Sequence, residues 1–203
     1  TFEKNDNLAL FFHGGVLDYR GQTGTLEDIS SKYDYATADT EVSKVDGSNI
    51  TVVDAGTKNE TIPFDNQQAI VKFTLKDNTG NPISMKSLRL HDENGKIFDI
   101  SDFLNESDHM GDIVVTRSTA GSEFYVAIKT EEDYAEPNLV PSSLNLTLTA
   151  TDDTDIYTYT KSGVQFECGK YYEITVKMTK SVLIIMIIEK VLTIEFYHRQ
   201  RLR

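Results

Sequence analysis

Along most of this chain, apolar and polar residues alternate with a period of two. The clearest stretch covers residues 69–76, where the apolar positions are Ala69, Val71, Phe73 and Leu75. Successive side chains of a β-strand point to opposite faces, so this pattern predicts a strand with one buried face and one solvent face. Similar patterns predict strands at residues 113–115, 124–128, 144–149, 156–160 and 172–178.

Clusters of turn-forming residues separate the predicted strands. Asp92–Gly95 lies between a run from Ile83 to His91 and a second run, Lys96–Ile100. An Asn-Gly pair between two alternating runs is the strongest short-range signal of a β-hairpin, so we expect these two runs to pair. A second turn, Asp152–Asp155, connects the predicted strands on either side of it.

Short strands joined by Gly, Asp and Asn turns are typical of an all-β protein built from two sheets. The sequence therefore predicts one antiparallel β-sandwich domain over residues 1–180. Helical signals are few, and we expect one or two short helical turns. Thr25 is a candidate N-cap, with Asp28 at the capping-box position three residues later, and Asp102–Asn105 is a candidate single turn.

Residues 181–203 differ from everything before them, because they contain no Gly, Pro, Asn or Asp and end in a basic stretch, His198–Arg203. Their first part is an apolar run made of Val182, Leu183, Ile184, Ile185, Met186, Ile187 and Ile188. With the preceding serine it is about eight residues long, far below the roughly 20 that a membrane-spanning helix requires, so we expect no transmembrane span. Three interpretations stay open: a terminal hairpin buried in the sandwich, a donor strand for a partner, or a stretch produced by a shift of the reading frame.

The composition is that of a soluble globular protein, with 39% hydrophobic and 26% charged residues. The formal net charge is -12 and the pI is about 4.7. Binding to nucleic acid requires clustered Lys and Arg to neutralise phosphates, so this balance argues against a nucleic-acid partner.

The residues that usually carry chemistry do not converge. The four histidines occur singly, at His13, His91, His109 and His198. Cys168 cannot form an intramolecular disulfide, and its apolar surroundings predict a small core residue. The acidic Asp152–Asp155 could hold calcium, but a solvated turn between two strands is the simpler interpretation. We therefore expect no enzyme activity, no metal and no cofactor.

Two tyrosine pairs are candidates for a glycan-stacking surface. Tyr33 with Tyr35, and Tyr157 with Tyr159, are spaced so that both rings of a pair share one strand face. The alternative is that they pack in the core or at its rim.

Several segments together resemble fimbrillin-like proteins, the fimbrial subunits of type V pili. The resemblance covers roughly residues 8–180 and rests on the order and spacing of Gly21–Leu26, Tyr33–Ala38, Phe64–Phe73 and Phe166–Met178. It implies a transthyretin-like Greek-key β-sandwich, secreted to the cell surface or outer membrane of a Gram-negative anaerobe as a lipoprotein or fimbrium subunit. The chain has no lipid-bearing Cys near its start, so export is inferred from the resemblance.

The resemblance also implies a mode of assembly. In polymerising members, a protease removes an N-terminal strand, and a C-terminal strand of the next subunit fills the groove that opens. We therefore expect a non-catalytic pilus subunit or adhesin whose partners are other pilus subunits and possible host or bacterial surface ligands. The apolar run from Val182 to Ile188 is the candidate donor strand. The sequence assigns no cleavage site for the protease: Arg20 precedes Gly21, but it lies where a folded strand or loop is expected. The alternative is a surface glycan-binding lipoprotein module.

Overall fold

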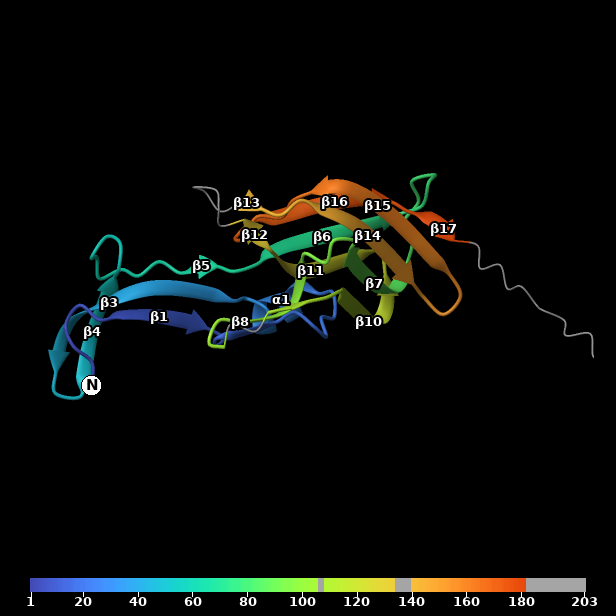
Figure 1. The fold of residues 1–203 in the computed structure, drawn as a ribbon. Helices are drawn as coiled ribbons and strands as arrows, with labels where there is room; N and C mark the ends of the chain where they lie inside the picture. The colour runs from blue at the N-terminus through green and yellow to red at the C-terminus, as the bar shows by residue number, and fades with distance from the viewer. Residues whose placement is uncertain (106–107, 134–139, 182–203) are drawn as a thin grey trace, which may run out of the picture.

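A computed structural model describes residues 1–105, 108–133 and 140–181 of the 203-residue chain. Nearly all of its regular structure is β-strand, as Figure 1 shows, which confirms the predicted all-β class. None of the helices in the described residues is long and apolar enough to cross a membrane.

Two sheets form the body of the molecule. The first, which we call the β14 sheet, has the order β10-β7-β14-β15-β17. Its strands are β10 (Ile113–Gly121), β7 (Met85–Asp92), β14 (Leu144–Thr151), β15 (Ile156–Val164) and β17 (Thr179–Ser181). The second, the β6 sheet, has the order β16-β6-β11-β8-β2, and β9 also pairs with β8. Its strands are β16 (Tyr171–Lys177), β6 (Ala69–Lys76), β11 (Glu123–Thr130), β8 (Ile97–Asp102), β2 (Val16–Asp18) and β9 (His109–Met110). Two short strands, β12 (Glu132–Asp133) and β13 (Val140–Pro141), pair with each other.

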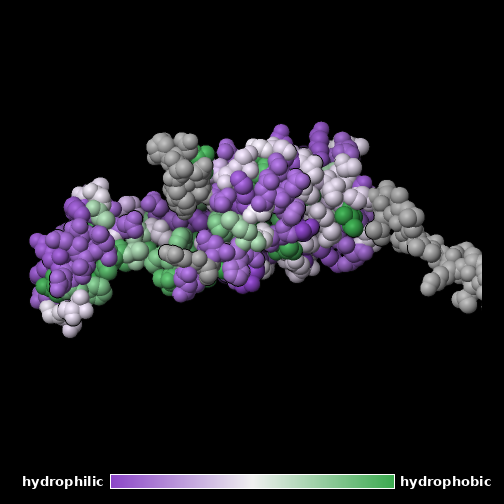
Figure 2. Space-filling view, viewed as in Figure 1, coloured by the Kyte–Doolittle hydropathy of each residue, from purple (hydrophilic) through white to green (hydrophobic). Residues whose placement is uncertain are grey.

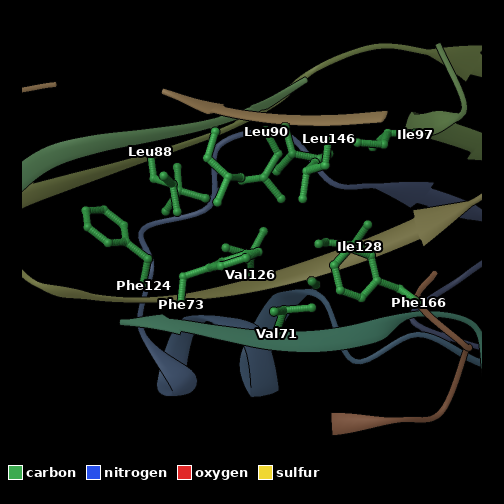
Figure 3. Close-up of a cluster of buried hydrophobic side chains, with 14 of the residues drawn as sticks. Val71, Phe73, Leu88, Leu90, Ile97, Phe124, Val126, Ile128, Leu146 and Phe166 are labelled. Carbon is green, nitrogen blue, oxygen red and sulfur yellow. The ribbon is translucent and has the colours of Figure 1, made fainter. Parts of the chain in front are cut away.

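The core lies between these two sheets, as Figure 3 shows for part of it. The period-two pattern explains why. In β6, Ala69, Val71, Phe73 and Leu75 are all at most 1% exposed, whereas the intervening side chains are partly exposed. From the facing sheet, the inward residues of β14 and β7 complete the cluster, so the predicted sandwich is confirmed.

The predicted hairpin at Asn94-Gly95 is wrong. A turn does form there, since the amide of Gly95 donates to the carbonyl of Asp92 at 3.0 Å, but β7 belongs to the β14 sheet and β8 to the β6 sheet. The carboxylate of Asp92 accepts bonds from the amides of Lys96 and Asn145, and so ties this corner to β14. The turn at Asp152–Asp155, by contrast, does join the antiparallel neighbours β14 and β15.

One strand pair is parallel. β16 runs beside β6 in the same direction, with Ile174 opposite Phe73 and Val176 opposite Leu75. The chain then passes through the fully buried Met178 and enters the other sheet as β17. The last two described strands therefore lie at the edges of different sheets.

An arm projects from the sandwich, visible at the left of Figure 1. It consists of β1 (Asn7–Phe12), β3 (Ala36–Asp46), β4 (Asn49–Asp54) and β5 (Asp65–Asn66). β3 is the central strand and pairs with the other three. Figure 2 shows apolar patches on the arm and where it meets the sandwich, and the exposed apolar residues of this part of the chain include Phe12 and Phe64. The sequence did not predict this arm.

The helix α1 (Leu26–Lys32) begins where it was predicted. The amide of Asp28 donates to Oγ1 of the N-cap Thr25 at 3.1 Å. The carboxylate of Asp28 accepts a bond from the amide of Thr23 rather than from the N-cap itself. The other candidate, Asp102–Asn105, forms a single hydrogen-bonded turn at the end of β8, in which the amide of Asn105 donates to the carbonyl of Asp102.

Candidate strand-acceptor groove

An apolar groove of about 230 Å³ opens between the two sheets, beside β15 and β16. It is lined by Phe73, Leu146, Leu148, Tyr159, Lys161, Val164, Phe166, Ile174 and Val176. The floor consists of core residues, because Phe73, Leu148 and Val176 are at most 1% exposed. Lys161 is the one charged residue in the lining, so the groove is suited to apolar side chains.

Alternation along the two bordering strands points their apolar residues into the groove. On β15, Tyr159 lies opposite Leu148 and Lys161 opposite Leu146, so both are on the core side of the sheet, with Tyr159 half-buried and Lys161 exposed. On β16, Ile174 and Val176 lie opposite the inward residues of β6. The sequence predicted the inward face of β16, and the structure confirms it.

Both bordering strands have a free edge. Within the described part of the chain, β16 is the last strand of its sheet and pairs only with β6. β15 pairs with β17 only at residues 156–158, so along 159–164 its second edge has no strand partner among the described residues. Free backbone N–H and C=O groups on such an edge are a template for another strand.

These two properties define what the groove can do. A strand added to an exposed sheet edge gains affinity from main-chain hydrogen bonds and specificity from pockets for alternate side chains. Here the free edge of β15 offers the hydrogen bonds, and the partly exposed Tyr159, Val164 and Ile174 offer the apolar contact. The groove therefore has the geometry of an acceptor for an extended apolar segment.

The donor segment predicted from sequence, Val182 to Ile188, lies outside the described residues. It follows directly after β17, whose Ser181 is opposite Ile156 of β15. The end of the described chain thus lies on the sheet that borders the groove, at the far end of the molecule from the arm (Figure 1).

The segment around Arg20 is held by its neighbours on both sides. Arg20 is exposed in a turn directly after β2, and its guanidinium forms an ion pair with Asp18 at 2.7 Å. The guanidinium hydrogen bond holds the pKa of the Asp18 carboxyl below its usual range. Before this turn, Leu17 and Tyr19 are at most 1% exposed and belong to the core. Arg20 is therefore accessible to a protease. A cut after it would separate Leu17 and Tyr19, whose side chains lie in the core, from the rest of the domain.

The tyrosine pairs do not form an exposed aromatic surface. Tyr33 and Tyr35 are 5% and 7% exposed, and their hydroxyls donate to the carbonyls of Arg20 and Asp18. Burial raises the pKa of Tyr33 to about 12. Tyr157 and Tyr159 are partly buried and pack against the core. The packing alternative, and not the glycan-stacking one, describes both pairs.

The other candidate chemistry is dispersed. No group of three or more His, Cys, Asp or Glu side chains could hold a metal in the part of the chain that the structure describes. The carboxylate of Asp152 accepts bonds from Thr154 and Asp155 within its own turn. His91 contacts Asp112, not another histidine. Cys168 is half-buried beside the carbonyl of Gln67 and is not a core residue as predicted, because it lies in the turn before β16.

No family model matches the chain, and no curated protein matches it. Among solved structures, the chain is similar to the crystal structure of a protein from Bacteroides ovatus that is described as a candidate cell adhesion protein. The two are 14% identical, the match covers 89% of this chain and 68% of that chain, and the TM-score is 0.41. Because the similarity is this low, the function is inferred from the groove itself.

Proposed function

We propose that the protein is a non-catalytic cell-surface subunit of a fimbrium or a related adhesive assembly, and that its subunits are joined by β-strand exchange. The observation that supports this most directly is the groove, in which an apolar lining from both sheets lies beside a strand edge that has no described partner. A monomeric sandwich normally protects such an edge, so an accessible one beside an apolar groove favours a partner strand.

The partner in this proposal is an extended, mostly apolar segment of another subunit. A β-branched apolar segment suits a groove of this kind, because its alternate side chains fill the core while its backbone continues the sheet. The run from Val182 to Ile188 is the candidate within this chain, and the proposal places the assembly at the cell surface.

A charge placed in the groove tests the proposal. Ile174→Lys puts an ammonium group where the incoming side chain would pack, whereas Thr175→Lys adds the same charge to the exposed outer face of the same strand. After limited trypsin treatment of the purified protein, we expect ladders resistant to sodium dodecyl sulfate for the wild type and for Thr175→Lys, and none for Ile174→Lys. Circular dichroism would establish that both variants are folded.

Two outcomes would argue against the proposal. Ladders that persist in folded Ile174→Lys would exclude the groove as the acceptor. An absence of ladders in the wild type under all protease conditions would remove the proposed assembly.

Deleting residues 182–203 separates the donor from the groove: a loss of ladders that is restored by adding an intact second copy would identify the tail as the donor strand.

A further inference from the structure

A second pocket, of about 260 Å³, lies where β8, β9 and β11 meet, and shares no residue with the groove. It is lined by Phe98, Ser101, Phe103, Asp108, Met110, Lys129, Thr130 and Glu131. Pockets for drug-sized ligands are roughly 300–1,000 Å³, so this one suits a smaller ligand such as a single ring.

Lys129 is the unusual residue of this pocket. It is 5% exposed, yet the ion pairs among the side chains that the structure describes do not include its ammonium group. Its Nζ lies 5.8 Å from the centroid of the Phe103 ring. Burial of a charge without a counter-ion is unfavourable, and the attraction of a cation to an aromatic face offsets only part of that cost.

The acidic residues of the pocket already have partners. Oδ1 of Asp108 accepts bonds from the Ser101 hydroxyl at 2.8 Å and from the amide of Asp102 at 3.3 Å. Oε2 of Glu131 lies near Lys96, at 3.9 Å, and accepts from Ser142. Among the described side chains of the lining, Lys129 is therefore the cation without a carboxylate partner, which leaves it for an anion from outside.

The remaining walls are apolar. Phe98 lies opposite both Lys129 and Met110 in its strand pairings, and Phe103 stacks on Phe11 of the arm with ring centroids 5.9 Å apart. Phe103 and Met110 are each about two-fifths exposed, so their apolar surfaces face the pocket opening. An aromatic wall beside hydroxyl and carboxylate oxygens is an arrangement that binds a sugar ring, with its apolar face on the aromatic group and its hydroxyls on the oxygens.

We propose that this pocket binds the carboxylate-bearing sugar unit of an acidic glycan, a hexuronic acid. The carboxylate pairs with Lys129, the ring packs on Phe103, and the exposed carboxylate of Asp108, which the buried Ser101 hydroxyl orients, accepts hydrogen bonds from ring hydroxyls. The site is independent of strand exchange, and would give the subunit a ligand at the end of the sandwich that the arm joins.

Calorimetric titration of the full chain tests the site with three probes: glucuronate, glucose and acetate. We expect glucuronate to bind, and glucose and acetate to bind at least about tenfold more weakly, since each lacks one half of the recognised group. Lys129→Met keeps the aliphatic stem and should lower glucuronate affinity by about tenfold or more. The control Lys44→Met removes an exposed lysine of the arm, 67% exposed at its side chain, and should leave binding unchanged.

Two further variants keep the test decisive if Lys129→Met does not fold. Lys129→Arg retains the charge and should bind glucuronate within a few-fold of the wild type. Asp108→Asn should weaken glucuronate but not acetate. The proposal is overturned if glucuronate fails to bind the wild type, if acetate binds as tightly as glucuronate, or if folded Lys129→Met binds glucuronate as the wild type does.

Discussion

The side chain of Gln22 hydrogen-bonds to the backbone of β11 as a neighbouring strand would, so removing this side chain should destabilise the fold. Gln22 is 1% exposed. Its Nε2 donates to the carbonyls of Tyr19 and Ala127 at 2.8 and 2.9 Å, and its Oε1 accepts from the amide of Ala127 at 2.8 Å. The amide therefore ties the segment after β2 to the middle of the β6 sheet.

Gln22→Ala leaves three buried backbone groups without these partners. Each unsatisfied buried group costs about 1–3 kcal/mol, so the low end of that range for all three gives a loss of about 3 kcal/mol in the free energy of unfolding. For a chain of this size a change of 1 kcal/mol lowers Tm by roughly 2–4 °C, so we expect Tm to fall by about 6–12 °C.

The assay is thermal unfolding followed by circular dichroism, with Gln165→Ala as the control. Gln165 is exposed and makes one bond, from its Nε2 to the carbonyl of Pro141. Its loss should change Tm by no more than about 2 °C. If Gln22→Ala unfolds within 2 °C of the wild type, the amide does not hold this segment and the reasoning fails.

Two other perturbations follow from the described contacts. Gly24 has φ +74°, and an added Cβ would lie 2.9 Å from Val115, so Gly24→Ala should lower the free energy of unfolding by more than about 2 kcal/mol. Gly47 has φ +61° and open space around it, so Gly47→Ala should lower it by only about 1 kcal/mol. Equal denaturant midpoints for the two variants would contradict this. Burial raises the pKa of Asp28, but bonds from Lys32 and Thr23 outweigh burial and leave this pKa below its usual value. The stabilisation from the Asp28 carboxylate is thus present above about pH 4 and is lost as the pH falls through the lowered pKa. Asp28→Asn should therefore be less stable than the wild type at pH 7 and approach the wild type near pH 2. A stability difference that stays constant with pH would refute the assignment.

Local patterns predicted the elements whose side chains alternate between core and solvent. β6, β14 and β16 follow the period of two because one face of each lies in the core. The cap of α1 was predictable because Thr25 and Asp28 interact within one turn.

Long-range pairing decided what the sequence could not. The Asn-Gly turn predicts a reversal of the chain, but not that the following strand joins the opposite sheet, since that depends on β14 and β11. The same holds for the groove. Its two borders exist because β16 pairs with β6 in parallel and β17 covers only one end of β15, and neither fact has a local signal. Gln22 and Ala127, likewise, are 105 residues apart.

Hydrogen–deuterium exchange of the isolated subunit and of its assembled form tests the central claim most directly, because it reads the backbone of the groove itself. Alternate amides of residues 159–164 point to the edge of β15 that has no described strand partner, while the others face β14. We predict that peptides covering this edge and β16 gain strong protection on assembly, while peptides from the outer strand β10 do not change. Assembly that leaves the protection of residues 159–177 as it is in the monomer would contradict strand exchange at this groove.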